Sequence, residues 1–321
     1  IAVFFIPMYY KLKVYTAYEF LEQRFDVKTR TFTALLFLIQ RAFSTGITIY
    51  APSIILSQLL GWDLNTTVIF IGGIVTIYIL SGGTKAVAVT HKQQMFVIYV
   101  GMFTAFGCLI YYLSEYVSFN ESLNVAGALG KMNIITTGAE SGSFDWSDRY
   151  NIISGLIGGL FLQLSYFGTD QSQVGRYLGG ESVKESRLGL IFNGLMKVPV
   201  QFFILLTGVL VFVFYQFNQP PVYFNEVAYT QTKNSIYAEE LDRLETAYLA
   251  ATDNQTKLNR ELAEQKVTAD AQQTEILRNS QEQVNGLRTE INAVIKKANP
   301  DIDDDHDYIF MHFVMNYLPI G

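Results

Sequence analysis

Several long apolar runs constrain the fold of this chain more than any other feature. A helix that crosses a bilayer needs about 20 apolar residues, and several runs reach or approach that length: residues 32–60, 66–80, 95–117, 152–166 and 189–215. Residues 1–10 and 312–321 have the composition of two further, partial spans. We therefore predict an all-α polytopic membrane protein and expect the chain to be a fragment of a longer one.

Charged residues are concentrated in one segment of the chain. Only 16% of all residues are charged, against roughly 25% in soluble domains, and half of the charged residues are concentrated between Glu226 and Asp307. The net charge of -6 belongs mainly to that segment and argues against nucleic acid as a partner. With three His, one Cys and no phosphate-binding loop, the sequence contains no hydrolytic or redox constellation, so we expect neither an enzyme nor a resident cofactor or metal.

Basic residues alternate between the connections and predict the orientation of the chain. They crowd the connections before residue 32, around residue 90 and after residue 175, whereas the connections between these are poor in Lys and Arg. Because basic connections stay in the cytoplasm, residues 218–307 are expected outside, in a periplasm or the extracellular space. We predict a multi-pass protein of a bacterial inner membrane or other plasma membrane. Its parts would be a partial transmembrane core (1–217), an extracytoplasmic insert (218–307) and the start of the next transmembrane helix (308–321).

The insert has apolar residues at alternating spacings of three and four, which predicts a coiled-coil seam, imperfect at Gln255 and Ser280. Both ends must return to one membrane face, so we favour two antiparallel helices that turn near residues 267–273 over one helix of about 90 Å. The seam closes either within one chain or between chains, which leaves self-association or a protein partner through residues 237–297 open. The two sets are Leu241, Leu244, Tyr248, Ala251, Gln255, Leu258 and Leu262, and Leu277, Ser280, Val284, Leu287, Ile291 and Val294.

An acidic run, residues 301–307, follows the second set. Clustered carboxylates bind calcium loosely in some proteins, but this run lacks the spacing of a calcium-binding loop. We expect a solvated acidic linker.

Residues 162–178 change from an apolar helix to Gly168, Thr169, Asp170 and Gln171 while still near the hydrocarbon. Polar residues at that depth are costly unless they line a water-filled path or a binding site, and transporters use broken helices to hold solutes and ions near the midplane. We predict that this segment belongs to a permeation site. Asp170 and Gln171 are candidates for the ion pathway, or else they satisfy backbone groups that the break leaves free.

Arg41 is the sharpest local anomaly, because the apolar residues 32–40 precede it. Ser44 and Thr48 share its helix face, and a guanidinium is a natural bidentate partner for a carboxylate. Arg41 and Ser44 are therefore candidates for solute binding. The alternatives are a structural pair with an acid elsewhere in the chain and a side chain that snorkels to the cytoplasmic end.

Four motifs in matching order resemble the sodium:solute symporter family: residues 15–25, 46–52, 82–87 and 170–177. The second, Gly46-Ile47-Thr48-Ile49-Tyr50-Ala51-Pro52, looks most like the branch that carries iodide, monocarboxylates and vitamins. The resemblance covers residues 4–217 and resumes at 313–321 without the insert. It implies a fold of two inverted five-helix repeats, of which this chain would hold a part: the later helices of the first repeat and the first two of the second.

The resemblance also implies roles for single residues. Gln163 falls where family members contact solute with an amide, Tyr166 where sugar carriers place an inner-gate ring, and Phe167 where a second aromatic residue follows. Lys197 falls where a sugar-carrying relative reaches solute with a lysine. Packing aromatic rings, an interhelical amide and a snorkelling lysine are the alternatives.

His91 stands where family members have an Asp that is associated with sodium on its way to the cytoplasm. A neutral imidazole titrates near physiological pH, so either the ion exit differs here or that Asp is dispensable. The resemblance implies sodium-coupled symport of a small organic solute, a carboxylate or a sugar or polyol, by alternating access across the lipid bilayer. The helices that build the family's chief sodium site lie largely outside this chain, so no sodium ligand is assigned. The alternatives are a membrane sensor or scaffold that binds a partner through the insert, and a proton-coupled carrier.

Overall fold

All of the regular secondary structure in the part of the chain that the structure describes is helical. The computed structural model describes residues 1–133, 136–138, 144, 151–180, 182–264, 271–300 and 304–319, and no strand occurs in these ranges. This confirms the predicted all-α class. The chain divides into two compact units, one formed by Ile1–Ala88 with Ile134–Gln201 and the other by Val89–Asn133 with Phe202–Gly321.

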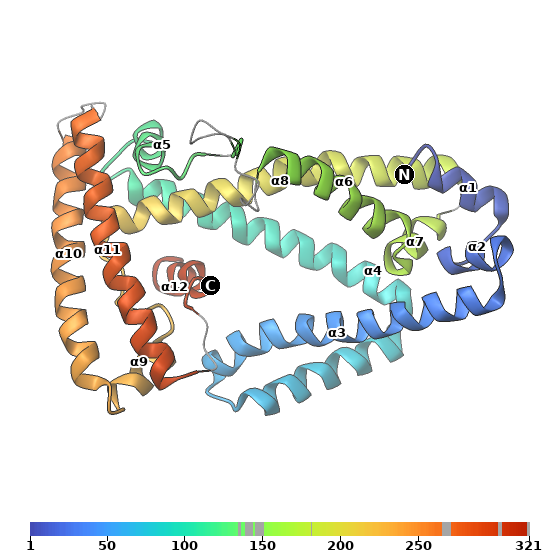
Figure 1. The fold of residues 1–321 in the computed structure, drawn as a ribbon, viewed down its shortest axis with the longest axis horizontal. Helices are drawn as coiled ribbons and strands as arrows, with labels where there is room; N and C mark the ends of the chain where they lie inside the picture. The colour runs from blue at the N-terminus through green and yellow to red at the C-terminus, as the bar shows by residue number, and fades with distance from the viewer. Residues whose placement is uncertain are drawn as a thin grey trace. The chain divides into compact units, whose positions relative to one another are not determined.

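The first unit contains the N-terminal helices and the broken segment (Figure 1). Helices α4 (Leu64–Leu113) and α8 (Val183–Phe217) contribute to both units. The other helices of this unit are α1 (Phe5–Leu12), α2 (Ala17–Arg24), α3 (Val27–Leu60), α6 (Ile152–Gly168) and α7 (Gln171–Leu178).

In the part of the chain that the structure describes, four helical segments are long and apolar enough to cross a membrane, and α6 with α7 forms a fifth candidate that is bent by 58° at its break. The four are Val27–Ser57, Leu64–Gly83, Val89–Leu113 and Val183–Phe217. Each overlaps a predicted apolar run. No residue in the apolar window of the first is buried, which suits a helix whose solvent is lipid, because apolar side chains need no protein cover there. The multi-pass membrane protein predicted from the sequence is thereby confirmed.

The connection expected between the second and third runs is helical. Helical residues lie on both sides of Gly83, which alone has a non-helical backbone within α4, with φ 55° and ψ -160°. Glycine adopts this conformation without the clash that a Cβ would cause. The two spans are thus joined by a sharp break at one residue, with His91 at the start of the second span.

The core of the first unit lies where α1, α2 and α7 meet. Ile6, Tyr9, Tyr18, Val174 and Tyr177 are buried there. These side chains come from opposite ends of the unit's sequence, so the short helix α7 is packed against the N-terminal helices and not only against its neighbours in the chain.

The second unit contains the predicted insert. Its helices besides parts of α4 and α8 are α5 (Phe119–Ala128), α9 (Glu226–Lys233), α10 (Ala238–Glu264), α11 (Ala271–Ala298) and α12 (Tyr308–Tyr317). The end of α8 packs with the end of α4 and with α12 around Leu109, Leu210, Phe214, Phe217 and Phe313, which are all buried.

Helices α10 and α11 lie side by side and run antiparallel (Figure 1). Lys297 contacts Glu240 at 3.4 Å and the Gln255 amide donates to Gln281 Oε1 at 3.0 Å, so residue numbers rise along one helix as they fall along the other. The two predicted antiparallel helices are observed. Residues 267–270 of the expected turn (267–273) lie outside the described residues, as does the side chain of Leu262, whereas residues 271–273 already belong to α11.

The apolar seam of the insert is used within the chain. Leu241, Leu244, Tyr248, Val284 and Ile291 are buried in one cluster between the two helices. The seam therefore closes without a second chain. Its polar member Gln255 is paired, as described above, and does not leave a buried amide unsatisfied.

The acidic run after α11 is not simply a solvated linker. Asp301, Ile302 and Asp303 lie outside the described residues, so the calcium alternative rests on positions about which nothing is observed. Asp304 is exposed, but Asp305 is fully buried. Its carboxylate accepts a hydrogen bond from the Phe224 backbone N–H at 2.7 Å and pairs with Arg288 at 2.6 Å. The expectation of solvation is wrong at this residue, because a cation 17 positions earlier in the sequence partners it.

Candidate functional site

The break between α6 and α7 organises the candidate site. Helix α6 ends with the Thr169 hydroxyl donating back to the Ser165 carbonyl at 2.9 Å. Asp170 then takes an extended backbone conformation and caps α7, because its side chain accepts from the Ser172 backbone N–H at 2.8 Å. A carboxylate at this position satisfies an orphan N–H and suits the positive end of the helix. The polar residues of the break therefore start a new helix in a new direction.

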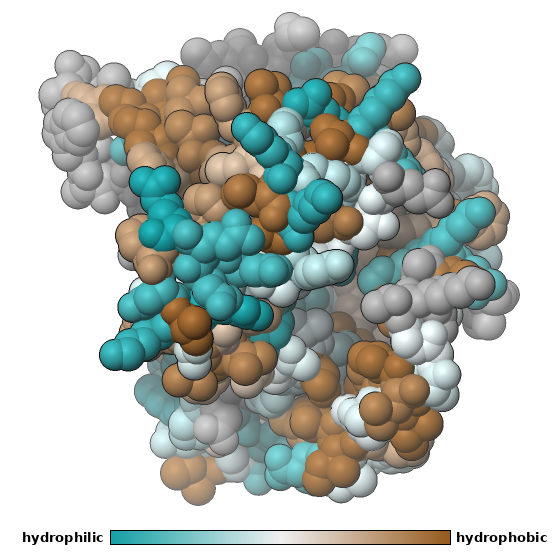
Figure 2. Space-filling model, turned by 90° about the vertical axis from the view of Figure 1, so that its right-hand side faces the viewer, coloured by the Kyte–Doolittle hydropathy of each residue, from teal (hydrophilic) through white to brown (hydrophobic). Residues whose placement is uncertain are grey.

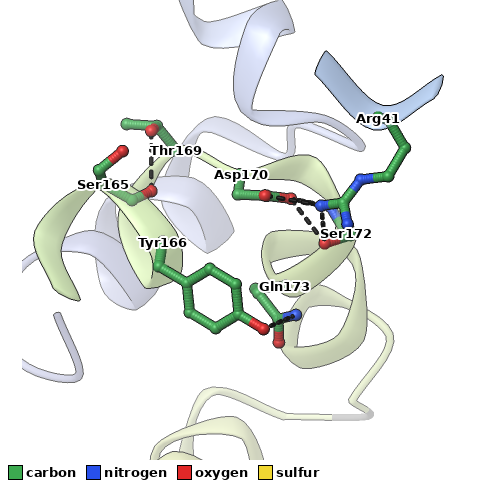
Figure 3. A network of polar contacts seen from close by, with 7 residues as sticks. All are labelled: Arg41, Ser165, Tyr166, Thr169, Asp170, Ser172 and Gln173. Atoms are coloured by element: carbon green, nitrogen blue, oxygen red, sulfur yellow. Dashed lines mark hydrogen bonds and ion pairs between the residues drawn. The ribbon is translucent and has the colours of Figure 1, made fainter. Parts of the chain in front are cut away.

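Arg41 reaches the break from α3. Its Nη2 lies 2.7 and 2.8 Å from the two carboxylate oxygens of Asp170 and 2.6 Å from Ser172 Oγ (Figure 3). The guanidinium also lies over the Phe37 ring at 5.4 Å. The Arg41 and Asp170 side chains are 36% and 16% exposed. Of the three roles considered for Arg41, the structure shows the pair with an acid elsewhere in the chain; a contact with solute stays a prediction.

The N-terminal helices hold α7 from the other side. The Tyr9 hydroxyl donates to the Gly168 carbonyl at 2.8 Å, and the Gln171 carbonyl oxygen accepts from the Ala17 backbone N–H at 2.9 Å. Burial raises the pKa of the Tyr18 phenol beside this contact. Gln171 thus satisfies a backbone group at the start of α2 and not one that the break leaves free, a role that Asp170 has at the Ser172 N–H. The place of Gln171 in an ion pathway stays a prediction.

The two aromatic residues at the end of α6 are arranged edge to face, with ring centroids 5.0 Å apart. The Tyr166 hydroxyl accepts a hydrogen bond from the Gln173 amide at 2.8 Å across the break (Figure 3). Tyr166 is 42% exposed and Phe167 is half-buried. Gln163 is exposed one turn before them on α6. These three predicted residues share one helix end.

The remaining predicted residues are spread more widely. Ser44 is exposed on α3, one turn beyond Arg41, and Lys197 is exposed on α8. His91 is exposed on α4 after the Gly83 break. The structure brings Arg41 and Asp170 together, places Gln163, Tyr166 and Phe167 beside the break, and shows no contact that joins Ser44, Lys197 or His91 to it within the described part of the chain.

A cavity of about 320 Å³ adjoins the break. It lies between α7 and the first turns of α8, with Phe167 at the end nearest α6. Its lining includes the side chains of Gln173, Arg176, Ser186 and Asn193. Such a volume is at the lower end of the range for small-molecule sites.

Sequence reasoning missed Ser172, Gln173 and Arg176 as members of this region. Ser172 follows an Asp by two residues, a spacing typical of a side chain that caps a helix start. Gln173 and Arg176 are three apart in a helix and so share a face. No sequence pattern indicated the contact made by the Tyr9 hydroxyl, because its partner Gly168 is 159 residues away.

Fold and site together define the class as an all-α, multi-pass membrane protein with one span broken at polar residues. The chain belongs to the sodium:solute symporter family, whose model matches residues 1–239. The recognition made from the four motifs is confirmed, and the match extends beyond the expected boundary at residue 217. The expected resumption at 313–321 stays a prediction.

Individual relatives cover only part of the chain. Mouse sodium-coupled monocarboxylate transporter 2 is 31% identical over 189 residues, which are 59% of this chain and 29% of the relative. The human sodium/iodide cotransporter is 29% identical over 214 residues, 67% of this chain and 32% of the relative. Human sodium-coupled monocarboxylate transporter 1 is 33% identical over 189 residues, 59% of this chain and 30% of the relative. The chain thus spans about a third of the length of these relatives.

Proposed function

We propose that the full-length protein carries a small organic solute across the membrane together with sodium, by alternating access. The observation that carries this proposal is the broken span α6–α7, whose break holds Asp170 against Arg41 of another span. Charged residues within spans are expensive and mark solute or ion pathways. Membership of the sodium:solute symporter family supports the same function.

For the solute we propose a small monocarboxylate in preference to a sugar or polyol. Two of the three relatives described above are named as monocarboxylate transporters. Gln163 would donate to the solute, and Tyr166 and Phe167 would cover it and exclude water. Ser44 and Lys197 would complete the site from α3 and α8. Arg41 would contact the carboxylate only when Asp170 releases it.

The exposed basic residues support the orientation that we propose. Figure 2 shows hydrophilic side chains gathered on a face of the molecule, with hydrophobic side chains beside them. Exposed basic residues of the first unit include Lys11, Lys13, Arg24, Lys28 and Arg30. We assign the connections that carry them to the cytoplasm and the insert to the opposite side, in a plasma membrane. His91 would then lie near the ion exit.

The insert gives no support to a sensor or scaffold. Its apolar seam is buried between α10 and α11, so the periodic residues that predicted a possible partner surface already have partners. We assign the insert no part in transport; from residue 240 onward it lies outside the residues that the family model matches.

The test is uptake by the full-length parent in proteoliposomes with labelled pyruvate, lactate, galactose and inositol. An inward sodium gradient should drive uptake of an acid, and potassium in place of sodium should abolish it. Gln163→Ala should raise KM, whereas Gln201→Ala, an exposed amide on α8, serves as the matched control. Sodium-driven uptake of a sugar would replace the proposed solute. Uptake that follows a pH gradient and ignores sodium would favour proton coupling, and no uptake with any probe would contradict transport.

A further inference from the structure

The cavity between α7 and α8 has the chemistry of a carboxylate site. Arg176 and Gln173 lie three residues apart on α7, and Asn193 faces them from α8. Phe167 and Leu190 add apolar surface. A small organic acid needs this combination, a charged or amide donor set for its carboxylate and apolar contact for its carbon atoms.

Arg176 is available for a ligand. It is exposed, and among the described residues no ion pair or hydrogen bond involves its guanidinium. Its other role is at the last turn of α7, where a cation suits the negative helix end. One carboxylate, Glu185, also lines the cavity; it lies in the first turn of α8, where the helix end stabilises negative charge.

The cavity is joined to the break by shared residues. Phe167 lines it and packs against Tyr166, and Gln173 lines it while donating to the Tyr166 hydroxyl. A ligand in the cavity that accepts from Gln173 would compete with that hydroxyl. Occupation of the cavity and release of the Tyr166 side chain are therefore linked through one amide.

We propose that this cavity is a second, cytoplasmic-side subsite for the transported carboxylate, with Arg176 as its anion-binding group. The inference rests on the proposed function and on the proposed orientation, in which the α7–α8 connection is assigned to the cytoplasm. Solute that leaves the break passes Tyr166, binds Arg176 and Gln173, and then enters the cytoplasm.

The experiment measures KM for labelled pyruvate and lactate separately from each face, in right-side-out and inside-out vesicles that contain the full-length protein. Arg176→Gln should raise KM at the cytoplasmic face by about tenfold, as expected for loss of a charged hydrogen bond, and change KM at the outer face by less than about twofold. Glu185→Gln should lower the cytoplasmic KM. Lys184→Gln is the matched control, because it removes an exposed cation one residue from Glu185 that does not line the cavity.

Arg176→Lys separates binding from helix stability. Lysine keeps the cation at the end of α7 but not the guanidinium fork, so the protein should stay as stable as wild type while its cytoplasmic KM remains raised. Equal KM changes at both faces, or an Arg176→Gln effect no larger than that of Lys184→Gln, would overturn the subsite and leave symport standing. Absence of acid uptake by the wild type would overturn the proposed carboxylate function and this inference with it.

Discussion

The buried pair of Arg288 and Asp305 makes a quantitative prediction for the insert. The Asp305 side chain is 0% exposed and that of Arg288 is 16% exposed. Arg288→Met removes the cation and leaves a buried carboxylate with the Phe224 N–H as its remaining described donor. Breaking a buried ion pair from one side costs about 3–5 kcal/mol, and we expect this loss in the free energy of opening of α10 and α11.

The reciprocal change should cost less. Asp305→Asn keeps an acceptor for the Phe224 N–H, and the guanidinium that remains lies over the Phe224 ring at 4.9 Å and is partly reached by water. We expect a loss of about 1–3 kcal/mol. The double variant buries no charge. It also loses no hydrogen bond from Arg288 Nε, because that atom has no partner among the described residues. It should therefore lie within about 2 kcal/mol of wild type, so that the coupling energy, the two single losses summed less the loss of the double variant, is at least about 2 kcal/mol.

Hydrogen exchange followed by mass spectrometry on the full-length protein in detergent measures these opening free energies for the α10 and α11 amides. Lys257→Met is the control, because its pair with Asp253 is exposed on both sides and should contribute less than about 1 kcal/mol. Additive losses in the double variant, or an Arg288→Met loss equal to that of Lys257→Met, would refute the reasoning from burial.

Three further predictions concern the site and the insert. Arg41→Ala should lower the free energy of unfolding of the detergent-solubilised protein, followed by a thermal scan, by about 1–3 kcal/mol because Asp170 loses its cation. Adding Asp170→Asn should recover most of that loss. Equal losses in the single and the double variant would show that the pair does not stabilise the protein. Tyr9→Phe should cost about 1–2 kcal/mol through the Gly168 carbonyl, whereas Tyr166→Phe, exposed, should cost less by the same thermal scan. Replacement of residues 225–304 by a flexible linker should leave sodium-driven uptake largely intact, and abolished uptake with normal expression would restore the scaffold reading.

The spans and the break were predictable from sequence because each is written in consecutive residues. The length of an apolar run can be counted in the sequence and compared with the thickness of the bilayer. Gly168, Thr169 and Asp170 interrupt a helix through their own chemistry, without any distant partner. The seam of the insert was predictable for the same reason, since its spacing repeats. Predicting which residues share one face of a helix requires no information about the other helices.

The partners of polar residues could not be predicted in this way. Arg41 was identified as an anomaly, but its partner lies 129 residues away, and no local pattern specifies which acid a guanidinium will meet. Asp305 was taken for a solvated residue because its neighbours are acidic, yet burial and Arg288 decide its environment. The break at Gly83 is a further case, because the sequence does not distinguish a break at one glycine from a longer connection between two helices.

The attachment of the insert has a mechanical consequence. Helices α10 and α11 cross the end of α8 and do not continue it (Figure 1), and Asn259 is tied to the Gln216 carbonyl while Arg260 is tied to that of Phe217. From Asn259 to the start of α10 the helix extends about 30 Å. If α8 tilts by about 10° during transport, that end swings by about 5 Å over this length. The hairpin of α10 and α11 thus pivots at the end of α8, and a probe at Ile236, which is exposed just before α10, would report the tilt of a helix inside the membrane.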